Sequence, residues 1–91
     1  MPYIEPTDRK KYDEVRQSLN DLKSIETKGD LEYLIYLMML KYMDDRPEKY
    51  GHLHDCVYGV KHSAHEFERH RLDAREDYAK DINGDITLDR G

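Results

Sequence analysis

The chain has 91 residues, of which 38% are charged and 37% hydrophobic, and its formal net charge is −5. A chain of this length forms one domain with a small core, because it buries only about 60% of its unfolded surface. The acidic balance argues against a protein that binds duplex nucleic acid, which normally presents a net basic face. The composition therefore predicts one small, polar domain over residues 1–91.

The cellular location is predicted from the cysteine content and the opening segment. Cys56 is the only cysteine, so no intrachain disulfide is possible and a reducing compartment is expected. The opening segment, MPYIEPTDRKK, has no apolar stretch of the kind that a signal peptide contains. We therefore expect a cytoplasmic protein.

The first predicted helix covers residues 8–28. Thr7 or Asp8 can cap its N-terminus. Apolar side chains then recur at spacings of three and four residues, which predicts one buried stripe on an amphipathic helix. The stripe consists of Tyr12, Val15, Leu19, Leu22 and Ile25. We expect Gly29 to end this helix and Asp30 to cap the next, so that the two helices pack antiparallel after a very short connection.

The second predicted helix, residues 31–45, is apolar on every side. Glu32 and Lys41 are the only charged residues in the run LEYLIYLMMLKYM. The run is about seven residues shorter than a bilayer span requires, so we interpret it as a buried helix. The other two helices are too few to cover it all round, and surplus apolar surface usually marks a subunit interface. We therefore expect a homo-oligomer.

The third predicted helix is long and covers residues 51–82. Its inward positions alternate in steps of four and three, a seven-residue repeat that is typical of a coiled-coil-like seam. These positions are Leu53, Val57, Val60, Ala64, Phe67, Arg71, Ala74, Tyr78 and Ile82. Asn83 and Gly84 should end the helix, and residues 85–91 should form a mobile tail. The expected fold is all-α, a three-helix bundle with a long C-terminal helix that assembles into a homo-oligomer.

Three patterns resemble metal or amine chemistry, and each has a simpler explanation. His62, Glu66 and His70 lie four residues apart on one helix face, but the outer pair is separated by about 12 Å, too far for one ion. Residues 81–89 match alternate positions of a calcium loop but lack its glycine and its last carboxylate. Pro2 resembles the terminal amine of proline tautomerases, yet a helix follows where those enzymes have a strand. We expect neither a metal nor a cofactor.

Catalytic patterns are not found in the sequence. It contains no clear nucleophile–base pair, no glycine-rich phosphate loop and no catalytic serine signature. Cys56 lies beside Val57 on the apolar side of the third predicted helix, where an inert packed thiol is expected. We therefore expect a protein that is not an enzyme.

Tyrosine and arginine are the best candidates for ligand binding. The chain has eight tyrosines against one phenylalanine and no tryptophan, and tyrosine stacks on flat ligands while keeping a hydroxyl for hydrogen bonds. Arg71 falls in the predicted seam, where a buried guanidinium requires a carboxylate from another subunit or an anionic ligand. Alternatively, the core thins at that point and Arg71 reaches water. The residues expected to bind a ligand are Tyr3, Arg9, Tyr50, His54, Arg69 and Arg71.

Several short motifs, taken together, resemble a family of small proteins common in phages and prophages. The motifs are MPYI at residues 1–4, GDL at 29–31, EF with a following arginine at 66–69, and NGD at 83–85. The likeness spans nearly the whole chain. Glu68, His70 and Arg75 depart from the pattern, so a site on the third helix can differ in this member. The resemblance implies a phage accessory protein in the host cytoplasm, without implying a particular activity.

The leading functional hypothesis is an oligomeric binder that sequesters a small anionic nucleotide signal of host immunity. The size, the expected assembly and the Tyr/Arg/His content are typical of small helical phage proteins of that class. An acidic helical inhibitor or adaptor that binds a host protein is the alternative, and it fits the net charge of −5. A structural bundle without a ligand is the third possibility. The expected partners are thus a second copy, a nucleotide-type ligand or a host protein, and neither duplex nucleic acid nor a membrane.

Overall fold

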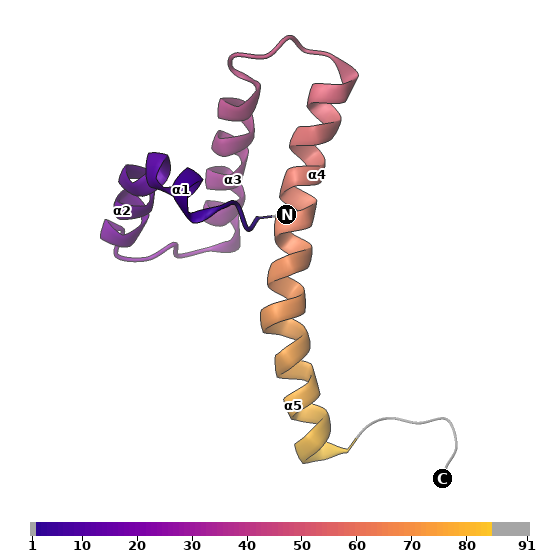
Figure 1. Ribbon diagram of the computed structural model, residues 1–91. Helices are drawn as coiled ribbons and strands as arrows, with labels where there is room; N and C mark the ends of the chain where they lie inside the picture. The colour runs from indigo at the N-terminus through magenta and orange to yellow at the C-terminus, as the bar shows by residue number, and fades with distance from the viewer. Residues whose placement is uncertain (1, 85–91) are drawn as a thin grey trace.

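The computed structural model describes residues 2–84, and over that range the chain consists of helices and their connections (Figure 1). Three helical units follow one another, which confirms the predicted all-α class and the long C-terminal helix. We call the first unit the arm. The units are the arm, with α1 (Pro6–Arg9), η1 (Lys10–Tyr12) and α2 (Asp13–Asp21); the middle helix α3 (Lys28–Met43); and a long helix made of α4 (Tyr50–Phe67), the π-helical turn η2 (Glu68–Leu72) and α5 (Asp73–Asn83).

The arm is shorter than its apolar pattern predicts. Pro6 opens it at a first helical position, where the missing N–H removes no helical hydrogen bond. α2 then ends at Asp21 instead of residue 28, and Leu22 has extended backbone angles, φ −65° and ψ 134°. Residues 22–27 form a non-helical linker to α3. The last two members of the apolar stripe thus lie outside the helix.

The start of α3 also differs from the prediction. Gly29 and Asp30 do not separate two helices but lie in the first turn of α3. The N-cap is Thr27, whose side-chain oxygen accepts a hydrogen bond from the backbone N–H of Asp30 at 3.0 Å. A threonine hydroxyl satisfies one of the free donors at a helix start, so the helix begins at Lys28.

α3 and α4 form an antiparallel hairpin (Figure 1), and their contact holds what little core the chain has. Cys56 is the one hydrophobic side chain within residues 2–84 that is buried. Its Sγ lies 3.7 Å from the Met39 carbonyl oxygen, which fits the predicted packed thiol. Besides Cys56 and Glu66, six side chains of α3 and α4 are neither buried nor exposed but intermediate: Leu34, Ile35, Met39, Met43, His52 and Val60.

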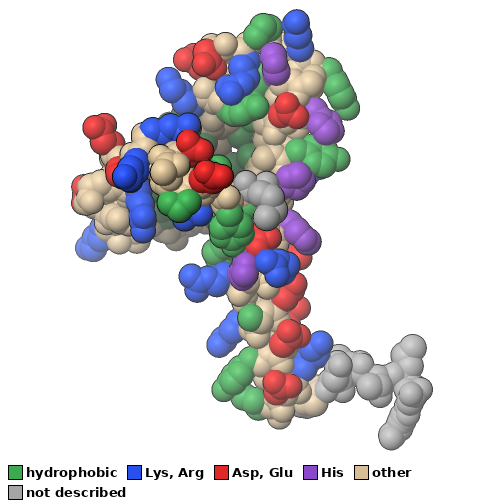
Figure 2. Space-filling view, in the orientation of Figure 1, with side chains coloured by type: hydrophobic (Ala, Val, Ile, Leu, Met, Phe, Trp, Pro, Cys, Tyr) green, Lys and Arg blue, Asp and Glu red, His purple; other side chains and the backbone are tan. Residues whose placement is uncertain are grey.

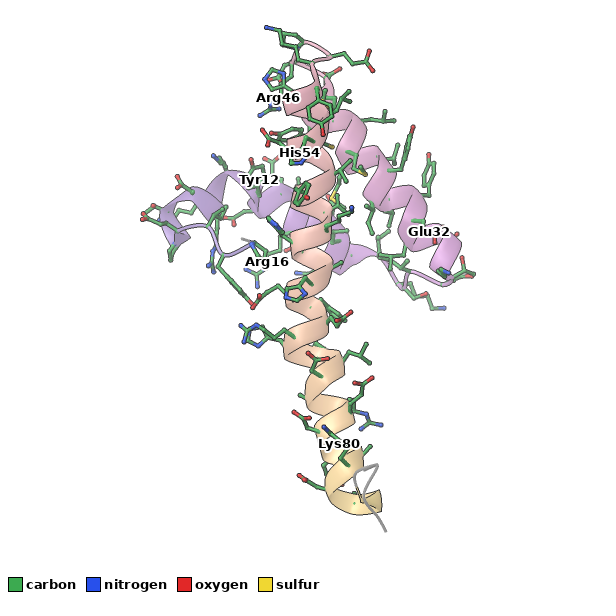
Figure 3. All side chains as sticks on the ribbon, turned by 90° about the vertical axis from the view of Figure 1, so that its right-hand side faces the viewer. Tyr12, Arg16, Glu32, Arg46, His54 and Lys80 are labelled. Atoms are coloured by element: carbon green, nitrogen blue, oxygen red, sulfur yellow. The ribbon has the colours of Figure 1, made fainter. Side chains whose placement is uncertain are left out.

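The arm does not pack along this hairpin. In the described part of the chain, substantial packing between helices distant in sequence is confined to α3 against α4. Tyr12, Val15 and Leu19 of the arm remain 53%, 54% and 47% exposed. Figure 3 shows Tyr12 and Arg16 on one side of α4, and Glu32 of α3 on the other. The three-helix bundle is therefore wrong as a description of a single chain, because the arm ends early and the linker separates it from α3.

α3 keeps much of its apolar surface open. Tyr33, Tyr36 and Leu40 are exposed, since α4 covers one side of the helix only. Between Pro2 and Gly84, no helix is both long and apolar enough to cross a bilayer. The radius of gyration is 18.1 Å, against about 12 Å for a compact domain of this length. The chain is open rather than globular.

The long helix extends beyond the hairpin, so that α5 stands clear of the other elements (Figure 1). It ends at Gly84, which has a φ of +88° and donates its N–H to the Lys80 carbonyl at 2.7 Å. A positive φ is favourable for glycine because no Cβ clashes with the backbone. The predicted end of the helix is therefore confirmed.

Replacing Thr27 by alanine tests the observed start of α3. Thr27→Ala should lower the free energy of unfolding by about 1 kcal/mol, because the Asp30 N–H loses its acceptor. Urea unfolding at one fixed protein concentration measures the change. Thr27→Ser keeps a hydroxyl and should retain most of the stability. If Gly29 and Asp30 formed the helix boundary instead, both variants would behave like the wild type.

Candidate functional site

The first polar cluster is built around Glu66 in the last turn of α4, whose side chain is only 11% exposed. Its Oε1 accepts a hydrogen bond from Arg69 Nη2 at 2.7 Å and lies 2.8 Å from His70 Nε2. Arg69 and His70 follow Glu66 by three and four residues, the spacings that bring side chains together on a helix. One carboxylate therefore holds both basic side chains at the start of η2.

The ionisation of the cluster follows from these contacts. The hydrogen bond from Arg69 lowers the pKa of Glu66 below its usual 4.5, although burial acts in the opposite direction. The charges of Arg69 and His70 lower the pKa of Glu66 further. The same hydrogen bond from Arg69 to Glu66 raises the pKa of Arg69. Glu66 is thus a carboxylate and Arg69 a cation at neutral pH.

The N-terminal segment, residues 2–5, lies against one side of this cluster through Tyr3. The Tyr3 ring meets the His70 ring edge-on, with centroids 6.1 Å apart, and a hydrogen bond from Tyr3 helps to lower the pKa of Glu66. Arg9 turns back onto the same segment, because its Nε donates to the Ile4 carbonyl at 2.7 Å. Of the predicted ligand residues, Tyr3 and Arg69 are therefore brought together, and Arg9 supports the segment that carries Tyr3.

Arg71 lies outside the core, contrary to its predicted place in the seam. It is exposed, and it has no ion pair within residues 2–84. The physical reason is η2, because a π-helical turn adds a residue to the turn and shifts the phase of the seven-residue repeat after Phe67. No second helix packs there to cover a seam. Of the alternatives for Arg71, the structure favours a side chain in water.

A row of aromatic rings forms the second candidate site, on α4. The ring centroids of Tyr50 and His54 are 5.7 Å apart, those of His54 and Tyr58 4.2 Å, and those of Tyr58 and His62 5.5 Å. We call these four residues the aromatic row. The residues recur every fourth position and so share a helix face. Figure 2 shows that histidine side chains follow the long helix down the molecule.

The aromatic row joins two predicted ligand residues to two that the sequence analysis did not place in a site. Tyr50 and His54 were predicted, whereas Tyr58 and His62 complete the row. The four-residue spacing was visible in the sequence, but only the stacking geometry makes it a continuous surface. The Lys61 ammonium lies 5.6 Å from the centre of the Tyr58 ring, so a cation accompanies the row.

Two apolar grooves border the α3–α4 contact. The larger, which we call the main groove, has a volume of about 620 Å³ and is lined largely by apolar side chains from Leu31 to Phe67. The smaller, about 400 Å³, lies near the turn of the hairpin. Both grooves include Met39 and Cys56, so the thin contact between α3 and α4 separates them.

Metal ligation has no support among the described residues, where no three His, Cys, Asp or Glu side chains converge on one point. His62 ends the aromatic row, while Glu66 and His70 bind each other. Most of the calcium-loop pattern, residues 85–89, lies outside the described residues.

Comparison with known proteins gives a family but no characterised relative. A family model described as "Domain of unknown function (DUF6899)" matches residues 1–86. No curated protein and no solved structure matches the chain. The phage association implied by the sequence motifs stays a prediction.

The Glu66 cluster predicts an acid-dependent loss of stability. The folded pKa of Glu66 is lowered, so its contribution to stability is complete above the usual pKa of 4.5 and is lost as the pH falls through the folded pKa. Urea midpoints measured from about pH 7 to pH 3 should therefore fall more steeply for the wild type than for Glu66→Gln. Glu76→Gln, which removes an exposed carboxylate on α5, should keep the steep wild-type dependence. Parallel curves for the wild type and Glu66→Gln would contradict the role of the cluster.

Proposed function

We propose a function for this chain, which belongs to the DUF6899 family. It is a non-enzymatic binding protein that works as a homo-oligomer. Its ligand is a small anion of nucleotide type. The aromatic row is the observation that carries this proposal. A nucleotide combines a flat base with charged phosphate, and the long helix offers surfaces for both. The accessory role in a phage that the motifs imply is compatible with such a binder.

The base-binding part of the proposal rests on exposed rings. Tyr50 and Tyr58 are exposed, and His54 lies between them. Any of the nucleobases can stack on such a surface, because each has a flat π-face. Each base–aromatic contact contributes about 1–3 kcal/mol. The imidazole nitrogens and phenolic hydroxyls in the row can also donate hydrogen bonds to the base or the sugar. The row therefore combines stacking with polar recognition.

The phosphate-binding part rests on the basic side chains that continue the row. His62 is followed one turn later by Glu66, and then by His70 and Arg69 of the first cluster. Two nitrogens of Arg69 donate hydrogen bonds to Glu66, while the Arg69 side chain remains 57% exposed. The other guanidinium N–H groups can therefore bind an anion. Lys61 and Arg71 add exposed positive charge along the same helix. These charges suit phosphate, which pairs with arginine through charge-assisted hydrogen bonds.

Assembly is part of the proposal because one chain provides a surface rather than a pocket. Small-ligand sites usually bury most of the ligand in a concave site. The aromatic row is a helix face, and a second copy placed beside it would supply the opposite wall. The main groove and the exposed arm leave enough apolar surface for such a contact.

A second candidate function is the binding of a basic host protein, and α5 is the observation that favours it. α5 carries Asp73, Glu76, Asp77 and Asp81 against Arg75 and Lys80, and it is exposed throughout its described side chains. Because α5 stands clear of the hairpin, a partner can reach it from several sides (Figure 1). Acidic surfaces of this kind steer association with basic partners.

The nucleotide proposal predicts a thermal shift with linear or cyclic nucleotides. At fixed protein concentration, a ligand present at 100 times its Kd should stabilise the fold by about 2.7 kcal/mol. Tyr58→Ala should weaken binding by about 5- to 150-fold, because it removes the central ring of the row. Tyr33→Ala, which removes an exposed tyrosine of α3, should bind like the wild type.

Two results would contradict the nucleotide proposal. One is that no nucleotide shifts the melting temperature of a protein shown by light scattering to be oligomeric. The other is an equal loss of affinity in Tyr58→Ala and Tyr33→Ala. Capture of a basic protein that weakens with added salt and with Glu76→Lys would favour the second candidate instead.

A further inference from the structure

We propose that the chain assembles by exchange, with the arm of one copy seated in the main groove of a second copy and the second arm seated reciprocally in the first. The inference rests on the assembly part of the proposed function, not on its ligand. It starts from two apolar surfaces that the single chain leaves uncovered. These are the stripe of the arm and the main groove between α3 and α4.

The arm has the form of a helix built to enter a groove. Tyr12, Val15 and Leu19 lie on one face of α2 and its N-terminal turn, and Leu22 continues the face at the start of the linker. Anchors at spacings of three, four and three residues are the pattern with which amphipathic helices bind hydrophobic grooves. All four side chains are between 47% and 54% exposed. The arm thus carries apolar anchors that no surface of its own chain covers within the described residues.

The main groove has the matching chemistry. Leu31, Met38 and Phe67 line it and are themselves exposed, and Cys56 lies at its floor. Its volume of about 620 Å³ is large enough to take several apolar side chains at once. A helix with an apolar stripe would cover these side chains along the hairpin.

The charges beside the two surfaces are complementary. Arg16 follows Val15 at the edge of the arm stripe, and Asp55 lies at the main groove. Neither side chain has an ion pair within the described residues of one chain. When the arm occupies the groove of another copy, the two opposite charges come to the same rim. Such pairs favour the correct register more than they add affinity.

The linker provides the freedom that exchange requires. Its six residues, 22–27, are non-helical and can span up to about 20 Å. α2 is not held against α3 or α4 by substantial packing. Moving the arm therefore strains mainly the contacts of the N-terminal segment, where Tyr3 meets His70 and Glu66. A mobile element attached through a hinge is the usual route to exchange between identical chains, and reciprocal exchange closes a twofold dimer.

The available area also favours a second copy as the occupant. The accessible surface of the chain is 8671 Å², against about 5,600 Å² for a globular monomer of its mass. The excess of about 3,100 Å² per chain is at least as large as one chain's share of a permanent homodimer interface, which is about 1,000–2,500 Å². Two arms in two grooves use this excess symmetrically, because each chain supplies one arm and one groove. A partner that covered only the groove would leave the arm stripe in water.

A disulfide between an engineered cysteine and the native one tests the exchange. In Leu19→Cys, the new thiol lies in the arm stripe and Cys56 lies in the main groove. Under mild oxidation without nucleotide, we expect a covalent dimer on a non-reducing gel that disappears in Leu19→Cys combined with Cys56→Ser. Gln17→Cys places the thiol on the polar face of the same helix and should give at least tenfold less covalent dimer. The absence of nucleotide separates this result from any failure of ligand binding.

Each alternative has its own outcome. A disulfide formed within one chain would show that the arm closes over its own groove, and would overturn the exchange. A covalent dimer that persists in Leu19→Cys combined with Cys56→Ser would show a disulfide between the two arms. That result would also overturn the exchange. As a second measurement, light scattering should show a dimer or a larger even-numbered assembly for the wild type and Gln17→Asp, and a monomer for Leu19→Asp. A monomeric wild type at about 100 μM would also overturn the proposal, since permanent homodimers have far lower dissociation constants.

Discussion

The contact between α3 and α4 is the constraint on which the rest of the structure depends. It buries one hydrophobic side chain, Cys56, and half-covers a few others. Ordering a residue costs about 1–2 kcal/mol of backbone entropy, and burial of apolar surface is the main term that offsets this cost. A single chain with so thin a core buries little apolar surface that could offset this entropy cost. In the proposed assembly, the exposed apolar faces of the arm and of the main groove are the surfaces through which a neighbouring copy would add stability.

The long helix divides into three parts with different properties. α4 carries the aromatic row, η2 carries the cluster of Glu66 with Arg69 and His70, and α5 carries acidic residues in open solvent. η2 is the boundary, because its π-helical turn changes the direction in which following side chains point. The N-terminal segment reaches this boundary through Tyr3. The N-terminal segment is thus linked to Glu66, the only buried carboxylate among the described residues.

The helical class and the end of α5 could be predicted because they depend on local patterns. Gly84 ends a helix for reasons that involve only its neighbours. The end of the arm could not be predicted from periodicity, since Leu22 and Ile25 keep the apolar spacing although their backbone is not helical. Arg71 was misplaced because a repeat extrapolated along a helix assumes a constant turn, which η2 breaks. The lowered pKa of Glu66 rests first on Arg69, a neighbour on the same helix, but its contact with Tyr3, more than sixty residues away, could not be predicted from the helical pattern.

The position of Cys56 makes the hairpin chemically observable. Its thiol is free and buried in the contact between α3 and α4, 3.7 Å from the Met39 carbonyl oxygen. A bulky thiol reagent that cannot enter the main groove reaches it only while the two helices separate, so the rate of modification measures how often the hairpin opens. Any ligand or second copy that holds the helices together slows this reaction, about tenfold for each 1.4 kcal/mol that it adds to the free energy of opening. The single thiol of the chain therefore reports how firmly the hairpin around it is closed.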